Sequence, residues 1–141
     1  AEYVSESVDE HGNKVYNAVG EMGGFLQVSG LTYEIHTGVA SSAEKDENGM
    51  FTRVSGEYRV KNVMVGGQPL ELDKTYTLAS HNYMLLGHGD GYTMFDGCEV
   101  LGEDMMVDNQ VLITYITTTL GGVVGEQYAN PYGDGRIVAV E

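Results

Sequence analysis

The sequence predicts an α+β domain built on a mixed or antiparallel sheet with one or two helices. Short segments that alternate apolar and polar residues are typical of half-buried strands. The chain holds 20 glycines but only two prolines, and glycine is the residue that tight turns most often require. One segment, which begins near Asp108, carries apolar residues at helical spacing. With 141 residues, 42% of them hydrophobic, residues 1–141 are expected to form a single domain or part of one.

The first expected strand lies in the N-terminal third of the chain. Residues 25–28 and 31–36 alternate in the manner of a strand, and Ser29-Gly30 would interrupt or bulge it. The small and charged residues 38–50 predict a solvent loop.

Two further strands are expected at residues 51–53 and 58–65. In the second of these, the parity of the apolar residues changes near Asn62, which predicts an irregularity such as a bulge. Gly66-Gly67 then predicts a two-residue hairpin turn.

The second half of the chain is expected to hold two strands, a shaped glycine loop and one helix. Asp108 is a good helix N-cap, and Gly121-Gly122 would end the helix. In chain order, the strand, the loop, the helix and the closing strand are expected at residues 74–80, 87–91, 108–120 and 137–140.

Charge and composition exclude several classes of function. The net charge of −14 repels polyanions and argues against nucleic-acid binding. No stretch approaches the roughly 18 apolar residues of a membrane helix, so membrane insertion is not expected. Cys98 is the only cysteine, which excludes an intrachain disulfide and a thiolate cluster, and we expect it to be a small buried residue.

No metal site or catalytic residue is predicted in this chain. The segment from Glu44 to Gly49 imitates the opening of a calcium-binding loop, but Ser55 stands where the loop needs a bidentate carboxylate. An exposed acidic loop is the better interpretation. The histidines lack the paired spacing of zinc hydrolases, and no nucleophile elbow is present.

The glycine run at residues 87–91 has three interpretations. A phosphate cradle has little support, because the spacing is wrong and Asp90 would repel phosphate. A plain turn is one alternative. The other is a loop that projects the Tyr92 ring into a cleft, and composition alone does not decide between these two.

Several blocks of the sequence together resemble the C-terminal domain of the 5′-nucleotidase family. They occur in the family's order and approximate spacing, and they cover residues 23 to 137 of this chain. The blocks are residues 23–31, 62–70, 73–76, 82–92, 121–128 and 135–137.

The resemblance implies a nucleoside-binding role. In this family, two aromatic rings of the C-terminal domain clamp the substrate's base, and a carboxylate holds the ribose hydroxyls. By motif, Phe25 and Tyr92 are the rings and Asp96 is the carboxylate. Residues Gly89, Asp90 and Gly91 would shape the loop. Because stacking uses the face of the ring, Tyr92→Phe is expected to be nearly neutral.

The resemblance also implies a parent enzyme and a location. The parent would be a secreted, periplasmic or cell-surface 5′-nucleotidase-type phosphohydrolase, whose N-terminal metallophosphatase domain holds two divalent metals and hydrolyses the phosphoester. The partners of this chain would be a nucleoside or nucleotide and that N-terminal domain. The chain itself would carry no cofactor and would be inactive alone. Alternatives are a 2′,3′-cyclic nucleotide phosphodiesterase of the same architecture and a non-enzymatic surface binding module.

Two departures from the family pattern carry expectations of their own. His88 stands where the family usually has glycine, which would alter the rim of the base pocket. The family domain begins upstream of Ala1, so the domain is expected to be truncated at its N-terminus. An open sheet edge or apolar face would then favour self-association.

Overall fold

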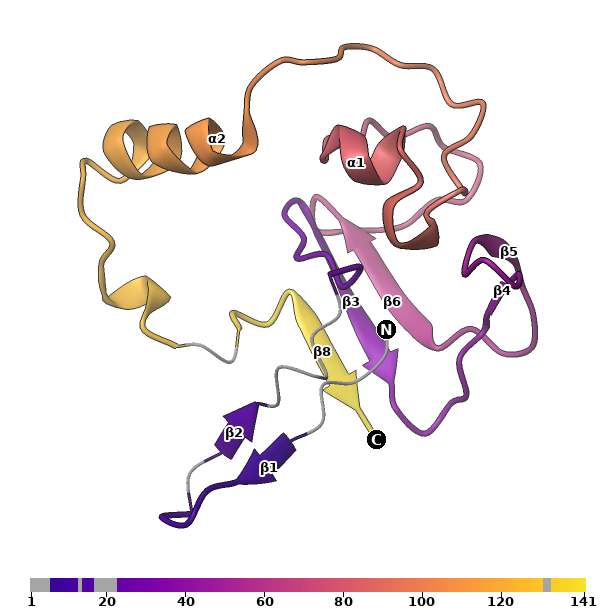
Figure 1. Ribbon diagram of the computed structural model, residues 1–141, viewed down its shortest axis with the longest axis horizontal. Helices are drawn as coiled ribbons and strands as arrows, with labels where there is room; N and C mark the ends of the chain where they lie inside the picture. Colours follow the sequence, from indigo (N-terminus) through magenta and orange to yellow (C-terminus); the bar gives the residue numbers. More distant parts are fainter. Residues whose placement is uncertain (1–5, 13, 17–22, 131–132) are drawn as a thin grey trace.

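A computed structural model describes residues 6–12, 14–16, 23–130 and 133–141, and its centre is a four-stranded mixed sheet (Figure 1). The strand order is β7-β6-β3-β8, with β3 antiparallel to β6 and parallel to β8. The predicted α+β class with a mixed sheet is therefore confirmed. The strands are β3 (Leu31–His36), β6 (Val60–Val65), β7 (Gln68–Pro69) and β8 (Ile137–Val140).

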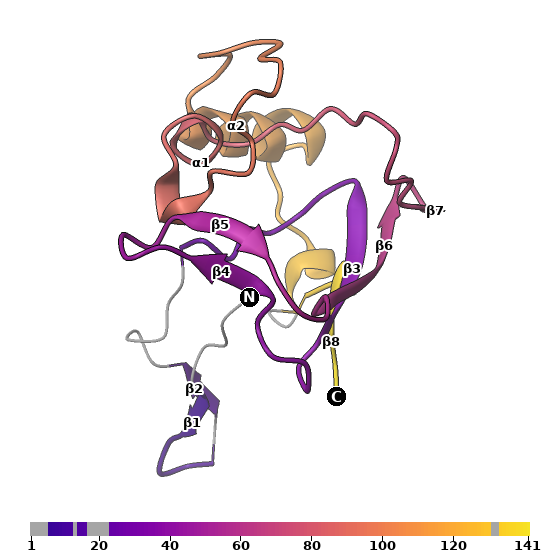
Figure 2. The ribbon, with the colours of Figure 1, turned by 90° about the vertical axis from the view of Figure 1, so that its right-hand side faces the viewer.

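Two hairpins flank this sheet. Strands β1 (Glu6–Val8) and β2 (Lys14–Tyr16) pair antiparallel and project away from the rest of the chain. Strands β4 (Ala43–Lys45) and β5 (Phe51–Val54) form the second hairpin, which lies beside the glycine loop (Figure 2). The expected solvent loop at residues 38–50 was therefore wrong in part, because it contains β4.

The irregularity predicted near Asn62 is a β-bulge. Thr32 pairs with Met64, whereas Glu34 pairs with Lys61, so β6 has one residue more than β3 over this stretch. Asn62 absorbs the extra length with a φ of 50°, a conformation that asparagine tolerates better than most residues. The change of parity in the sequence therefore predicted this bulge correctly.

The turn after β6 follows the sequence prediction as well. Gly66 and Gly67 have φ values of 57° and 77°, and Val65 pairs with Gln68 across them. Positive φ at both central residues is the requirement of a type I′ hairpin turn, which explains the glycine pair.

Helical structure is short and lies outside the sheet. The elements are α1 (Asn82–Leu85), the 3₁₀ turn η2 (Gly89–Gly91), α2 (Asp108–Thr114), its π-helical continuation η3 (Tyr115–Thr119), and the 3₁₀ turn η4 (Glu126–Tyr128). The N-cap of α2 is Val107 rather than Asp108, which is the first helical residue. Gly121 and Gly122, with φ of 66° and 84°, follow the end of the helix as expected. None of these helices has the length and apolar character that crossing a bilayer requires.

The described part of the chain has a small core. Ile35 of β3 and Met84 of α1 are the apolar side chains that it buries. Helix α2 stands apart from the sheet (Figure 1), and its apolar residues Val111, Leu112 and Ile113 are largely exposed. An apolar face is thus open, whereas self-association across it stays a prediction.

Three further expectations from the sequence were wrong. Residues 25–28 and 74–80 form no strand. Alternation predicts an extended backbone but does not supply a neighbouring strand to pair with, and the carbonyl of Val28 instead accepts a hydrogen bond from the Arg136 side chain. Cys98 is exposed rather than buried.

Candidate functional site

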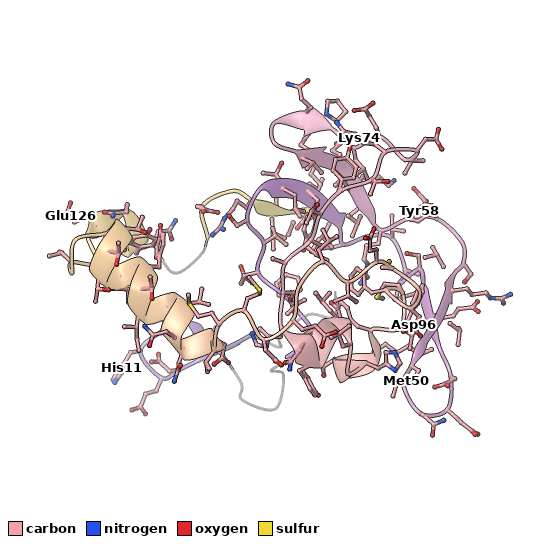
Figure 3. The ribbon with its side chains drawn as sticks, turned by 90° about the horizontal axis from the view of Figure 1, so that it is seen from above. His11, Met50, Tyr58, Lys74, Asp96 and Glu126 are labelled. Atoms are coloured by element: carbon pink, nitrogen blue, oxygen red, sulfur yellow. The ribbon has the colours of Figure 1, made fainter. Side chains whose placement is uncertain are left out.

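Three segments that are far apart in the sequence meet around Tyr92. They are residues 23–25, the turn of the β4–β5 hairpin, and residues 88–96 of the glycine loop. The last of these carries Asp96, which lies near Met50 of the hairpin and on the opposite side of the molecule from α2 and Glu126 (Figure 3). The resemblance had assigned site residues to the first and third segments only.

A hydrogen bond joins the two segments that carry the predicted aromatic rings. The hydroxyl of Tyr92 donates to the carbonyl oxygen of Gly24 at 2.6 Å, across 68 positions of sequence. Phe25 is the next residue and is half-buried. The structure therefore brings Phe25 and Tyr92 into one region, and the stacking clamp itself stays a prediction.

Glycine at position 24 is a condition of this approach. A Cβ added there would lie 3.0 Å from the Cβ of Asp90 and 3.7 Å from the ring of Tyr92. The first distance is shorter than an ordinary contact between carbon atoms, whereas the second is an ordinary van der Waals contact. The Asp90 side chain thus packs against the backbone before Phe25.

The β4–β5 hairpin is the platform on which the Tyr92 loop rests. Gly91 has a φ of 85°, and a Cβ at this position would overlap the carbonyl oxygen of Gly49. Thr93 donates from its hydroxyl to the carbonyl oxygen of Phe51 at 2.5 Å. Contacts with the backbone of the hairpin therefore hold Gly91 and Thr93, the residues on both sides of Tyr92.

The glycine run is a shaped loop, as the sequence predicted. His88 and Asp90 have φ values of 55° and 53°, in the left-handed region. Gly89 is buried, and a Cβ there would overlap the ring of Tyr83. The residues predicted to shape the loop, Gly89, Asp90 and Gly91, are thus fixed by close contacts or by unusual backbone angles.

Tyr92 and Tyr33, a residue of the central sheet, have pKa values raised above that of free tyrosine. Burial raises the pKa of Tyr92, and the negative charge of Asp90 raises it further. Burial likewise raises the pKa of Tyr33 on β3, with a smaller contribution from Tyr92. At neutral pH the Tyr92 hydroxyl is therefore protonated and can donate to Gly24.

Asp96 lies at the exposed end of the loop, and its carboxylate is paired. Its Oδ1 atom is 2.7 Å from Nε2 of His88. The backbone N–H of Asp96 donates to the carbonyl oxygen of Thr93 at 3.1 Å, which closes the turn between them. The sequence had placed Asp96 by motif, but nothing in the sequence linked it to His88.

Phe95 is a site residue that the sequence reasoning missed. Its ring stacks on Tyr92 with centroids 6.3 Å apart and ring planes inclined by 20°. One signal was available, since an aromatic residue three positions after a clamp aromatic can fold back on it across a tight turn. Phe95 is therefore part of the aromatic surroundings of Tyr92.

The residues of the site do not form a metal centre. No group of three or more His, Cys, Asp or Glu side chains in residues 6–12, 14–16, 23–130 and 133–141 is arranged to hold a metal ion. In the calcium-like segment, Asp46 Oδ1 accepts hydrogen bonds from the backbone N–H groups of Asn48 and Met50, each at 2.9 Å. This carboxylate therefore stabilises the hairpin turn.

A hollow of about 470 Å³ lies over the sheet instead of beside Tyr92. Its polar lining includes Glu34 and Asn62, and Glu34 Oε2 accepts a hydrogen bond from Asn62 Nδ2 at 2.7 Å. Nε2 of His36 lies 3.1 Å from the same oxygen. These polar groups satisfy one another, and the hollow is lined by none of the residues assigned from the resemblance.

Comparison with known proteins gives two matches. A family model described as "5′-nucleotidase, C-terminal domain" matches residues 7–97, well over half of the chain and including Phe25, Tyr92 and Asp96. Protein UshA of Yersinia enterocolitica serotype O:8 / biotype 1B (strain NCTC 13174 / 8081) is 42% identical over 57 residues. That alignment covers 40% of this chain and 10% of the relative, so the chain spans a small part of the relative's length. No solved structure matches the chain.

Proposed function

The chain belongs to the 5′-nucleotidase C-terminal domain family, and on that premise we propose that it binds the base and ribose of a nucleoside or nucleotide for a 5′-nucleotidase-type phosphohydrolase. The observation that carries the proposal is the hydrogen bond from Tyr92 to Gly24. It joins the segment of Phe25 to the loop of Tyr92, so that a base can be contacted by both.

Base binding would depend on stacking. A base held between the rings of Phe25 and Tyr92 gains dispersion and aromatic contact without a requirement for one particular base. Asp96, at the exposed end of the same loop, would accept hydrogen bonds from the ribose hydroxyls. The arrangement recognises a nucleoside by its shape and its sugar.

The phosphate of a nucleotide would be held elsewhere. No lysine or arginine occurs between Asn82 and Asp96, and the net charge of −14 does not favour an additional anion. In the proposed assignment, a divalent metal pair in an N-terminal metallophosphatase domain of the same protein binds and hydrolyses the phosphoester. Such an enzyme would act outside the cytoplasm, on nucleotides that it scavenges.

A titration with adenosine tests the proposal. The chain is expected to bind adenosine saturably and to bind ribose alone far more weakly, because the rings supply most of the affinity. Isothermal titration calorimetry measures both ligands. A surface-interaction module without a nucleoside site would show no saturable heat with adenosine.

The ribose contact gives a selective prediction. Asp96→Asn is expected to weaken adenosine binding by about tenfold or more, since a hydrogen bond to a charged group contributes about 1.5–3 kcal/mol. Binding of free adenine, which has no ribose, should be nearly unchanged. Calorimetry with the two ligands checks this, and equal losses for both would assign Asp96 a structural role.

The chain by itself is expected to release no phosphate from AMP. The described residues hold no cluster of metal ligands that could activate water. A malachite-green assay with Mg²⁺, Mn²⁺ or Zn²⁺ checks this after removal of contaminating phosphatases. Release above the background of a mock purification would contradict the expectation.

A further inference from the structure

His88 occupies a backbone position that a side chain disfavours. Its φ of 55° and ψ of 26° lie in the left-handed region, where glycine is the residue without steric cost, although histidine is among the residues that visit it. Residues held in such conformations cluster where the surrounding structure uses them. At this position the structure keeps an imidazole within the rim of the site.

The imidazole of His88 forms a hydrogen bond with the carboxylate of Asp96. Nε2 of His88 is 2.7 Å from Oδ1 of Asp96, across eight positions of sequence. The two side chains are 41% and 62% exposed. A pair this exposed contributes little to the stability of the fold, so its main physical effect is on the orientation of the two groups.

We propose that His88 is a positioning residue that orients the Asp96 carboxylate toward the ribose and so determines how strongly the site prefers a nucleoside to a free base. The inference rests on the proposed function, because it concerns how the same site recognises the ribose of its ligand.

The mechanism is preorganisation of a flexible acceptor. An exposed carboxylate samples several rotamers, and ordering it when the ligand arrives lowers the affinity. The Nε2–H of His88 donates to Oδ1 and holds the carboxyl group before ligand binding. The backbone bond from Asp96 N–H to the carbonyl oxygen of Thr93 fixes the main chain below it. The second oxygen, Oδ2, is then presented to a ribose hydroxyl in a fixed direction.

Two variants distinguish the proposed role of His88 from an effect of side-chain size and from direct contact with the base. His88→Gln keeps an N–H donor at nearly the position of Nε2, whereas His88→Leu keeps similar bulk without a donor. His88→Leu is expected to weaken adenosine binding by about threefold to tenfold, because the ligand must then order one flexible, exposed carboxylate when it binds. Its affinity for adenine should not change, and His88→Gln should bind adenosine within about twofold of the unchanged chain.

A double-mutant cycle with Asp96 completes the test. If His88 acts through Asp96, His88→Leu should cause no further loss of adenosine affinity in an Asp96→Ala background. Urea unfolding of each variant, measured alongside, should give midpoints close to that of the unchanged chain. Calorimetry with adenosine and adenine on the full chain supplies the binding data.

Three results would overturn the inference. Equal losses for adenosine and adenine in His88→Leu would show that His88 contacts the base or supports the loop as a whole. Unchanged adenosine affinity in His88→Leu would show that Asp96 needs no positioning. In both cases the proposed function would stand if the unchanged chain binds adenosine. A chain that binds neither ligand would overturn the proposed function and the inference together.

Discussion

Replacing Tyr92 with alanine is expected to weaken adenosine binding by about tenfold to a hundredfold, the equivalent of about 1–3 kcal/mol for one stacked base. The substitution removes the ring and also the hydroxyl that donates to Gly24. Phe25→Ala should cause a loss of similar size, because the base would then be covered on one face only.

The structure changes the expectation for the conservative substitution. Tyr92→Phe keeps the stacking face, and from the sequence alone it was expected to be nearly neutral. The Tyr92 hydroxyl, however, bonds to the Gly24 carbonyl at 2.6 Å, so the phenylalanine variant loses the bond between the two segments. A net hydrogen bond is worth about 0.5–1.5 kcal/mol, which predicts an intermediate loss of about twofold to tenfold.

A matched control uses an aromatic residue away from the site. The side chain of Tyr58 is 64% exposed and lies between β5 and β6, so Tyr58→Ala removes an equal ring without touching the clamp. Calorimetry should show equal affinities for the unchanged chain and Tyr58→Ala. The affinity of Tyr92→Phe should be lower, and that of Tyr92→Ala should be the lowest. Equal affinities of Tyr92→Ala and the control would contradict the clamp.

The second large effect is on stability, at Gly91. Gly91→Ala is expected to lower the free energy of unfolding by about 2–4 kcal/mol, the sum of a strained left-handed backbone and an overpacked contact. The overlap is with the carbonyl oxygen of Gly49, a backbone atom that cannot turn aside as a side chain would. The β4–β5 platform and the Tyr92 loop must therefore separate, and adenosine affinity should fall as well.

Gly97 supplies the control for this prediction. Its φ of 80° is close to the 85° of Gly91, but a Cβ at Gly97 would have no heavy atom within 4 Å. Gly97→Ala therefore carries the backbone strain alone and should cost about 1 kcal/mol. Urea unfolding followed by circular dichroism measures both variants. Equal losses would show that the close contact between Gly91 and Gly49 contributes nothing.

The parts of the fold that the sequence predicted are those with local causes. The alternation of residues 31–36, the change of parity at Asn62 and the pair Gly66-Gly67 each act within a few residues, and each appears in the structure as predicted. Residues 25–28 and 74–80 show the limit of such patterns. Their alternation is real, but whether an extended segment pairs in a sheet depends on a distant strand that the pattern does not encode.

The site divides in the same way. Phe25, Tyr92 and Asp96 are assigned by a resemblance that spans many blocks of sequence, and their roles in binding stay predictions. The contacts that position them could not be predicted, since Tyr92 reaches Gly24 and Gly91 meets Gly49 only in the folded chain. The acidic segment before Phe51 had appeared to be a plain solvent loop, yet its turn is the platform of the site. The role of that segment comes from its contacts with Gly91 and Thr93, which form only in the folded chain.

The central claim is that one nucleoside base contacts the rings of both Phe25 and Tyr92. Isotope-filtered nuclear Overhauser spectroscopy on the labelled chain with unlabelled adenosine measures this directly. We expect contacts from the adenine H2 and H8 protons to the ring protons of both residues, and the absence of these contacts in Tyr92→Ala. Saturable adenosine binding with contacts to neither ring, or to Tyr92 alone, would contradict the account.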